Sequence, residues 1–373
     1  NLSALSFRKG VEKNLFERMV DSAEESGTAV DDSSLHAMAE DYLMGDAITL
    51  GAVSFYDFLK KENEGKKVFW CNGSACLCAG TQEGLKKELA GHFEEKEIGH
   101  ICCLGRCHEN GAFQYEGKNY SGKSGEEIAT ILKSGEGDDA DRYAVGTSLA
   151  EPLLTAEFPG IEEYYAPLRE LFTRDREVVA QEWIQSGVRG RGGAGFPLGL
   201  KADACRKAQG SPKYVVCNAD EGDPGAYIDK YLMEERPHAV LFGMIAAGWF
   251  VEAEVGVLYI RAEYPDSIRI MEEAIRELEE AGWLGDDIQG SGLSFRLKVI
   301  KGAGAYICGE ETALLASIEG QRPEVRTRPP FPVEYGLFGK PTLLNNVETF
   351  ANVHPILRLG FEGYAAIGTE KSK

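Results

Sequence analysis

The sequence has no long uncharged apolar run, so we expect no helix that spans a membrane. Its most apolar segment, residues 241–260, carries Glu252 and Glu254 together with several glycines. Carboxylates are costly at the centre of a bilayer and rare in spanning segments. The segment is therefore expected to form a buried helix that runs on into a strand.

Positive charge is also scarce. The 373 residues include 40 lysines and arginines against 60 aspartates and glutamates, which gives a formal net charge of -20 at pH 7. A nucleic-acid-binding protein needs a basic face to meet the phosphate backbone, so we expect no nucleic-acid partner. The N-terminal segment lacks a basic start followed by a short apolar stretch and a cleavage site, and the expected location is therefore cytoplasmic.

The nine cysteines are clustered rather than spread along the chain. Six lie close together, namely Cys71, Cys76, Cys78, Cys102, Cys103 and Cys107. The other three, Cys205, Cys217 and Cys308, stand apart. An odd count in a long chain does not suit a secreted disulfide framework. The C-x4-C and C-x3-C pairs each follow an expected strand, and four thiolates so placed suit an iron–sulfur cluster better than structural zinc. Buried, unreactive cysteines are the alternative.

A chain of this length is expected to hold two or three domains. Residues 1–66 show helical spacing of apolar positions. Residues 67–133 alternate strand, helix, strand, hairpin and helix, as a small thioredoxin-like α/β domain would. The acidic, aperiodic residues 134–149 form the expected linker, residues 150–360 a larger Rossmann-like α/β domain, and residues 361–373 the start of an incomplete C-terminal extension.

Within the larger domain, the periodicity predicts three strands and one amphipathic helix. The strands are expected at residues 213–220, 255–263 and 293–301. The helix is expected at residues 268–282, where Gly282 closes it. The fold class is therefore multidomain α/β.

The string RGRGGAGFPLG at residues 189–199 combines five glycines, which leave the backbone uncovered, with two positively charged arginines. Glycine loses more conformational freedom on folding than any other residue, so a glycine cluster suits the close approach of a flat or phosphorylated ligand. A flexible hinge is the alternative. The string lacks the lysine of a P-loop and does not follow an obvious strand as a dinucleotide-binding fingerprint does.

A second glycine-containing motif, GEETALLASIEG at residues 309–320, predicts a helix that starts after Gly309. The amides at a helix start favour a phosphate or an electron-rich ring edge. Alternatively, Glu310 and Glu311 are ordinary acids of a first helical turn, and the later NNVET is a capping turn.

Taken together and in order, these motifs resemble one family. CNGSAC followed by CLGRC resembles the thioredoxin-like [2Fe–2S] domain of complex I-type NADH dehydrogenases. GRGGAGFP, CNADE-x-x-PG, Y-I-CGEETAL, PPFP and KPT-x-x-NNVET resemble the FMN- and NADH-binding subunit of the same enzymes. Fusion of the two in one chain is typical of soluble NAD-linked hydrogenases, formate dehydrogenases and electron-bifurcating complexes.

The resemblance implies a set of site residues. The implied [2Fe–2S] ligands are Cys71, Cys76, Cys103 and Cys107, with Cys78 and Cys102 as bystanders whose role spacing leaves open. The residues implied to bind FMN and NAD(H) are Gly190, Arg191, Gly192, Gly193, Ala194, Phe196, Lys201, Asn218, Asp220, Glu221, Asp223, Tyr306, Gly309, Glu310, Glu311, Phe331, Asn345, Asn346 and Thr349. Phe196 and Phe331 are the expected faces for the adenine, with ordinary core packing as the alternative.

The implied function is that of an NAD(H)-dependent oxidoreductase, a diaphorase subunit that passes electrons between NAD(H), FMN and iron–sulfur clusters. Its implied partners are other iron–sulfur subunits and a catalytic subunit of a larger soluble complex. The cofactors carry such chemistry, so no side chain is expected to act as nucleophile or base. A [4Fe–4S] cluster is expected only if a C-terminal domain continues beyond Lys373.

An electron-relay or scaffold subunit without dinucleotide binding is the alternative function. The family usually carries a tryptophan and a nearby phenylalanine after GLK, whereas this chain has ADACRK at residues 202–207. Arg328 also replaces the usual lysine before PPFP, which keeps the charge but changes the geometry. Asp223 is shorter than the usual glutamate.

Overall fold

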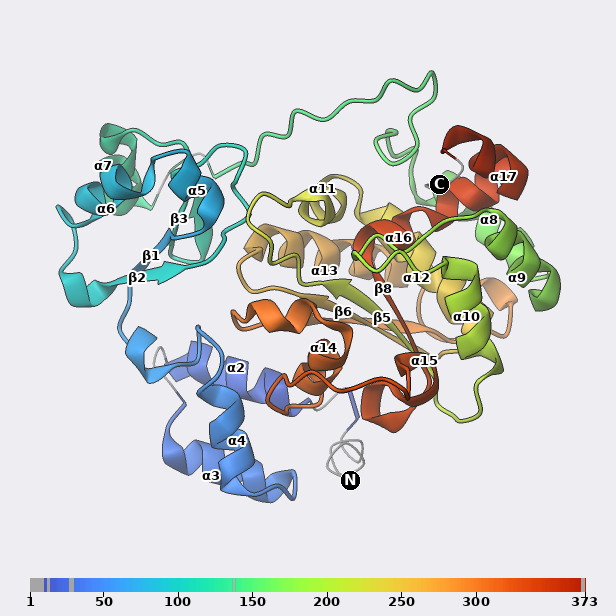
Figure 1. The fold of residues 1–373 in the computed structure, drawn as a ribbon, viewed down its shortest axis with the longest axis horizontal. Coiled ribbons are helices and arrows are strands. Elements are labelled where there is room, and N and C mark those ends of the chain that lie inside the picture. The colour runs from blue at the N-terminus through green and yellow to red at the C-terminus, as the bar shows by residue number, and fades with distance from the viewer. Residues whose placement is uncertain (1–9, 12–13, 27–29, 136, 138, 370–372) are drawn as a thin grey trace.

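The computed structural model describes residues 10–11, 14–26, 30–135, 137, 139–369 and 373. Within this part of the chain, two four-stranded sheets organise the fold, with strand orders β2-β1-β3-β4 and β7-β6-β5-β8. Figure 1 shows the first sheet and its helices set to one side of a larger body that holds the second sheet. The chain is therefore a multidomain α/β protein, as the sequence predicts.

The N-terminal helices share a core with the larger domain. They are α2 (Leu15–Ser26), α3 (Asp32–Asp41) and α4 (Asp46–Val53). Phe16 and Tyr56 are fully buried in one apolar cluster with Val216 of the larger sheet. The Tyr56 hydroxyl donates to Ser317 Oγ at 2.8 Å. These described helices agree with the expected spacing, while residues 1–9, 12–13 and 27–29 of that expected segment lie outside the described residues.

The small domain is built on a mixed sheet. Its strands and helices are β1 (Val68–Cys71), α5 (Ser74–Cys78), α6 (Gln82–Leu89), β2 (Ile98–Ile101), β3 (Phe113–Tyr115), β4 (Lys118–Tyr120) and α7 (Gly125–Ser134). Strand β1 runs parallel to β2 and antiparallel to β3. Parallel strands end at the same edge of a sheet, so the loops that follow β1 and β2 emerge side by side. These two loops carry the cysteines.

The larger domain is built on a parallel sheet of β5 (Tyr214–Ala219), β6 (Val255–Ile260), β7 (Arg296–Lys301) and β8 (Thr342–Asn346). The first three strands were expected from the sequence and the fourth was not. Alternate residues of β5 face opposite sides, so that Val215 lies in one apolar cluster and Val216 in another. Parallel sheets are normally covered on both faces, and this one is.

Helices cover the two faces of the parallel sheet. Those of the larger domain are α8 (Ile161–Leu171), α9 (Arg176–Gln185), α10 (Leu198–Lys207), α11 (Ile228–Glu235), α12 (Pro237–Val251), α13 (Pro265–Glu280), α14 (Glu311–Ile318), α15 (Pro332–Tyr335), α16 (Val347–Ala351) and α17 (Val353–Ile367). Short 3-10 turns are η1 (Lys61–Asn63), η2 (Glu95–Glu97), η3 (Ile288–Gly290), η4 (Tyr306–Gly309) and η5 (Leu337–Gly339). One face packs on α12, and the other packs on α14 and the N-terminal helices.

The apolar segment at residues 241–260 forms the end of α12 and all of β6, which confirms its interpretation as a buried helix running into a strand. Among the described helices, none combines the length and the apolar character needed to cross a membrane. Residues 136 and 138 of the expected linker and residues 370–372 of the expected C-terminal extension lie outside the described residues.

Candidate functional site

Four cysteines converge where β1 and β2 end. Cys71 is the last residue of β1, Cys76 lies on α5, and Cys103 and Cys107 follow β2. The Sγ atoms of Cys103 and Cys107 are 3.2 Å apart. A Cβ atom placed on Gly73 would lie 3.4 Å from Cys71 Sγ and 3.5 Å from the Cys103 Cβ, so the two loops meet across this glycine.

The four thiols shift one another's pKa values through the hydrogen bonds between them. A hydrogen bond from Cys107 holds the pKa of the Cys103 thiol well below its usual range. A hydrogen bond from Cys71 lowers the pKa of the Cys76 thiol to about 6. The thiolate is the form that binds metal. Four thiols within reach of one another, two of them with lowered pKa, fit the four-thiolate donor set of a [2Fe–2S] cluster.

The other two cysteines of the window differ from this group in their burial. Cys78 and Cys102 are both exposed, whereas Cys71, Cys76 and Cys103 are buried. Among the described residues, the converging set is therefore the one that the family resemblance implies. Cys205, Cys217 and Cys308 are buried in the larger domain.

The cysteine site touches the larger domain directly. The Gly225 amide donates to Cys107 Sγ at 3.1 Å. Gly225 has φ +102°, a conformation that residues with side chains rarely adopt. Because Gly225 lies in the loop that begins at the carboxyl end of β5, this loop joins the cysteine site to the edge of the parallel sheet.

That edge of the sheet gathers most of the residues implied to bind FMN. Asn218 of β5 pairs with Asn346 of β8 in the strand register. Asn218 Nδ2 donates to the Gly309 carbonyl at 2.8 Å. The Arg191 amide donates to Thr349 Oγ1 at 2.9 Å, which brings the glycine-rich loop to the start of α16. Ligands of open α/β sheets bind at the carboxyl ends of the strands, so this edge is the candidate flavin site.

Unpartnered polar atoms at this edge test whether a flavin fits. Asp220 Oδ2 and Asn345 Nδ2 are buried without a hydrogen-bond partner among the described residues. Buried polar atoms normally have a partner, and a bound ligand is one way to supply it. A Cβ atom placed on Gly193 or Gly195 would meet nothing within 4 Å, so open space lies beside the loop. An unpartnered carboxyl oxygen, an unpartnered amide nitrogen and an open glycine backbone together fit a flat, polar-edged ring such as that of FMN.

Three of the implied binding residues have structural partners of their own. Glu310 Oε2 accepts from the Thr312 and Ala313 amides at 2.8 and 3.0 Å, so it caps α14. The Glu221 carboxylate accepts from the Asp229 and Lys230 amides, each at 3.1 Å, at the start of α11.

Glu310 is thus the N-cap of α14 and satisfies its first amides, while Glu311 is an acid of the first helical turn, as the alternative expected. Asn346 likewise caps α16 by accepting from the Glu348 amide at 2.9 Å. A negative charge at a helix start is favourable, which explains both carboxylates without a ligand.

Lys201, Glu311 and Arg328 form a charged group beside these elements. Lys201 Nζ lies 3.4 Å from Glu311 Oε2, and Arg328 also pairs with the Glu311 carboxylate. Arg328 also lies 3.8 Å from Glu310 Oε1, so the two cations are balanced by two carboxylates.

Aromatic side chains are exposed near the same motifs. Phe196 is 55% exposed, Phe331 51% and Tyr306 68%. The Tyr306 hydroxyl donates to Asp223 Oδ1 at 2.6 Å. Core packing, the alternative for Phe196 and Phe331, is therefore wrong. Exposed rings of this size are available to stack on a planar ligand.

Sequence reasoning missed Arg261 and Glu263. They form a buried ion pair at 2.6 Å just after β6, and Arg261 also donates to the backbone carbonyls of Glu221 and Cys102. Arg261 thus links the loop that follows β5, which contains Glu221, to the loop that follows β2, which contains Cys102. The available signal was an arginine directly after a buried strand, at the edge where ligands bind.

A pH-dependent stability follows from Asp220. Burial raises its pKa to about 8, from a usual value of 3.8, so the folded chain holds this proton more tightly than the unfolded chain. Stability therefore falls as pH rises between these two values. In the flavin-free protein, Asp220→Asn is expected to raise the melting temperature by several degrees at pH 8 and by little at pH 5. Equal shifts at both pH values in differential scanning calorimetry would contradict this.

Comparison with known proteins identifies both regions. Residues 184–355 match the family model of the Nuo51 FMN-binding domain, and residues 9–136 match that of the thioredoxin-like [2Fe-2S] ferredoxin. An NADH-quinone oxidoreductase subunit of Rhizobium meliloti (strain 1021) is 50% identical over 188 residues, which cover 50% of this chain and 45% of the relative. The NAD-reducing hydrogenase HoxS subunit alpha of Cupriavidus necator is 35% identical over 346 residues, covering 86% of this chain and 58% of that protein.

A solved structure agrees with these matches. The crystal structure of an NAD+-reducing [NiFe]-hydrogenase in the H2-reduced state superposes with a TM-score of 0.79 at 26% identity, covering 95% of this chain and 63% of that chain. The chain spans 45% of the first of these curated relatives and 58% of the second.

Proposed function

We propose that this chain is a diaphorase module that passes electrons between NAD(H), FMN and iron–sulfur clusters, because residues 9–136 match the thioredoxin-like [2Fe-2S] ferredoxin model and residues 184–355 match the Nuo51 FMN-binding model. The observation that carries this proposal is the hydrogen bond from Gly225, in the loop of the flavin site, to Cys107 of the cysteine site. Two redox sites in direct contact suit electron transfer between them.

The flavin supplies the chemistry when bound, because it exchanges two electrons with a nicotinamide and single electrons with a cluster. The chain's residues hold and orient it. The glycine-rich loop offers open backbone, while Asp220 and Asn345 offer an unpartnered carboxyl oxygen and an unpartnered amide nitrogen. Cys71, Cys76, Cys103 and Cys107 would hold the [2Fe–2S] cluster.

The proposed dinucleotide site lies beside the flavin. Lys201 and Arg328 flank Glu311 and would attract the pyrophosphate, while Phe196 and Phe331 would stack on the adenine. By holding the dinucleotide beside the flavin, these residues would contribute the positioning of the two reacting groups. No side-chain nucleophile or base is required.

An anaerobic NADH titration of the purified chain, followed by visible absorbance and EPR, tests this function. Bleaching of a yellow chromophore by NADH, together with a [2Fe–2S] EPR signal in the reduced protein, is the expected result. A cluster signal that needs dithionite, without any flavin response to NADH, would replace the proposal with the relay or scaffold function. One feature favours that second function: α10 carries the buried Ala202 and Cys205 where the family usually has aromatic residues.

Phe196→Ala tests the dinucleotide site. Loss of one stacked ring is expected to raise the KM for NADH by about two- to tenfold, since an aromatic stack is worth about 0.5–1.5 kcal/mol. The kcat with an artificial acceptor should change little, because Phe196 would not touch the reacting ring. Val178→Ala is a matched control, since Val178 is also half exposed but lies on α9. An unchanged KM for Phe196→Ala would remove this residue from the site.

The remaining parts of the proposal concern the assembly. We propose that the chain works in the cytoplasm within a larger complex, together with other iron–sulfur subunits and a catalytic subunit. Two of its relatives are subunits by name, one of an NADH-quinone oxidoreductase and one of an NAD-reducing hydrogenase. A [4Fe–4S] cluster would belong to this protein only if a C-terminal domain follows Lys373.

A further inference from the structure

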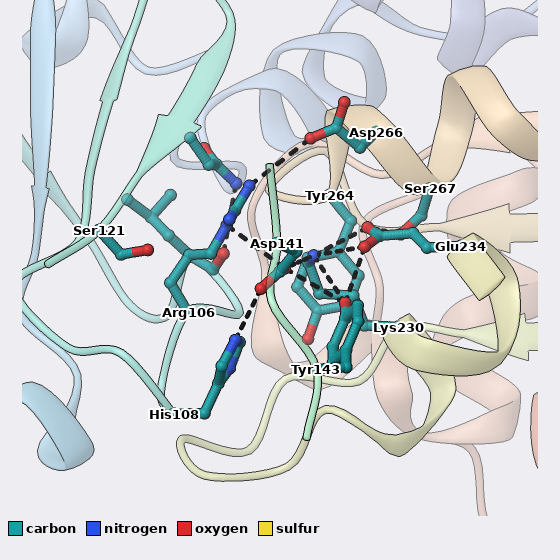
Figure 2. Close-up of polar contacts among 12 residues, drawn as sticks. Arg106, His108, Ser121, Asp141, Tyr143, Lys230, Glu234, Tyr264, Asp266 and Ser267 are labelled. Carbon is teal, nitrogen blue, oxygen red and sulfur yellow. Dashed lines mark hydrogen bonds and ion pairs between the residues drawn. The ribbon is translucent and has the colours of Figure 1, made fainter. Parts of the chain in front are cut away.

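A buried group of charges joins the small domain, the linker and the larger domain. At its centre is Asp141 of the linker, whose side chain is only 6% exposed. Asp141 Oδ1 lies 2.7 Å from His108 Nε2, and Asp141 Oδ2 lies 3.4 Å from Arg106 Nε and pairs with Lys230 Nζ. Figure 2 shows the Asp141 carboxylate between these three cationic or basic side chains. Arg106 and His108 belong to the small domain and Lys230 to α11 of the larger one.

A second layer of contacts balances the charge of this group. Lys230 Nζ lies 2.8 Å from the Glu234 carboxylate and 3.0 Å from the Tyr143 hydroxyl. The Tyr143 hydroxyl donates to Glu234 at 2.7 Å, and the Ser267 hydroxyl donates to the same carboxylate at 2.8 Å. Lys230 and Arg106 are each 1% exposed at the side chain, so two buried cations face two buried carboxylates. Such a group is stable only while every member keeps its partner.

The position of this group matters because of the residues next to it. Arg106 and His108 flank Cys107, one of the four converging cysteines. Lys230 lies on α11, which follows the loop that contains Gly225. The two domains are in close contact here, since a Cβ atom on Gly105 would lie 2.5 Å from the Tyr264 ring. Asp141 therefore contacts both the segment that carries Cys107 and the helix that follows Gly225. These are the two segments joined by the hydrogen bond from the Gly225 amide to Cys107 Sγ.

From this arrangement, and resting on the proposed function, we propose that Asp141 is a positioning residue for the cluster. By binding Arg106 and His108 on one domain and Lys230 on the other, it holds Cys107 Sγ against the Gly225 amide. Hydrogen bonds to the ligand sulfurs are among the factors that set the reduction potential of an iron–sulfur cluster. Asp141 thereby controls both the potential of the cluster and its placement beside the flavin site.

A metal site is the competing explanation of the same residues. One ligand atom each from His108, Glu109 and Asp141 lies within 4.8 Å of the others. However, the Asp141 carboxylate already forms ion pairs with Lys230 and Arg106, whose side chains are both buried. Their positive charges would repel a metal cation, so the contacts favour an ion-pair group.

Three variants of the cofactor-loaded chain test the proposal. Asp141→Asn removes the central charge, and Tyr143→Phe removes one hydroxyl from the group without changing any charge. Asp139→Asn is the matched control, because Asp139 lies on the same linker and its carboxylate pairs with Lys118 at 3.3 Å. The Asp139 backbone carbonyl, which accepts from Arg106, is unchanged by this substitution. If Asp141→Asn fails to fold, Tyr143→Phe carries the test alone.

The first readout is hydrogen exchange of the peptide that contains Gly225, measured by mass spectrometry on the oxidised protein. Release of the amide from Cys107 Sγ is expected to speed its exchange by roughly tenfold in Asp141→Asn and by less in Tyr143→Phe. Asp139→Asn should exchange like the wild type.

The second readout is the midpoint potential of the cluster, from EPR-monitored titration with redox mediators. Loss of an N–H···S bond destabilises the more negative reduced cluster, so the potential should shift downward in Asp141→Asn and Tyr143→Phe, while the flavin potential stays unchanged. Removing a nearby negative charge without moving Cys107 would shift the potential upward instead. The sign thus separates positioning from simple electrostatics.

Unchanged exchange at Gly225, or an upward shift of the cluster potential in Asp141→Asn with none in Tyr143→Phe, would overturn the proposal. Failure of the proposed function looks different. In that case the wild type itself would lack a cluster signal or would not bleach with NADH, whereas the exchange experiment would still report whether Asp141 holds Gly225 in place.

Discussion

Replacing Cys103 by serine is expected to abolish the [2Fe–2S] signal of the protein. Cys103 Sγ lies 3.2 Å from Cys107 Sγ, and hydrogen bonds from Cys107 and Cys71 make it the thiol of the group with the lowest pKa. Serine keeps the size of the side chain but not the soft thiolate that iron–sulfur clusters need. Visible absorbance, EPR of the dithionite-reduced protein and iron analysis should all show near-complete loss of the cluster.

Cys102→Ser is the matched control for this prediction. Cys102 is the neighbouring residue, yet it is exposed whereas Cys103 is buried. Its substitution should leave iron content and the EPR signal within error of the wild type. The sequence spacing leaves Cys102 open as an alternative ligand, so this pair of variants separates the two assignments. Loss of the cluster in Cys102→Ser, with retention in Cys103→Ser, would reverse the ligand set.

Much of the fold was predictable where the local signal is strong. The amphipathic pattern of α13 and the short apolar runs of β1, β5 and β6 were all recognised from periodicity. Strand β8 was not predicted from the sequence, because TLLNN is short and continues directly into NNVET, a pattern typical of a capping turn. Both features are present, since Asn346 ends β8 and also caps α16. A one-dimensional pattern does not show that one residue serves two elements.

The candidate site was predictable as a set of residues but not as an arrangement. Carboxylates in glycine-rich motifs look alike in the sequence, whether they bind a ligand or cap a helix. The fold shows that Glu221 and Glu310 cap α11 and α14, while Asp220 Oδ2 is buried without a hydrogen-bond partner among the described residues. The difference depends on where each strand and helix ends, which the sequence places only within a few residues.

The role of the linker was not predictable for a related reason. Its acidic composition suggests a solvated connection between domains, and nothing in the sequence pairs Asp141 with positions as distant as Arg106 and Lys230. Burial of the side chain comes from the contact between the two domains. Charge runs are usually solvent-exposed, so an acid that is buried by tertiary structure is visible only in three dimensions.

Gly243→Ala is expected to destabilise the protein by at least about 3 kcal/mol, the upper range for overpacking a core. Gly243 lies on α12 against α16, and a Cβ atom there would lie 2.0 Å from the Phe350 carbonyl oxygen. That neighbour is backbone, which cannot rotate away as a flexible side chain can. The helices would have to separate, and chemical denaturation should show a lower midpoint.

The same separation should reach the flavin site, because α16 carries Thr349 and is capped by Asn346, next to Asn345. FMN content after purification is therefore expected to fall together with stability, while the [2Fe–2S] content of the small domain is retained. Gly51→Ala is the control: Gly51 lies inside α4, where a Cβ atom would meet nothing within 4 Å, so the better helix propensity of alanine should stabilise by up to about 1 kcal/mol. If both variants behaved alike, the close approach of α12 and α16 would not be what requires glycine at position 243.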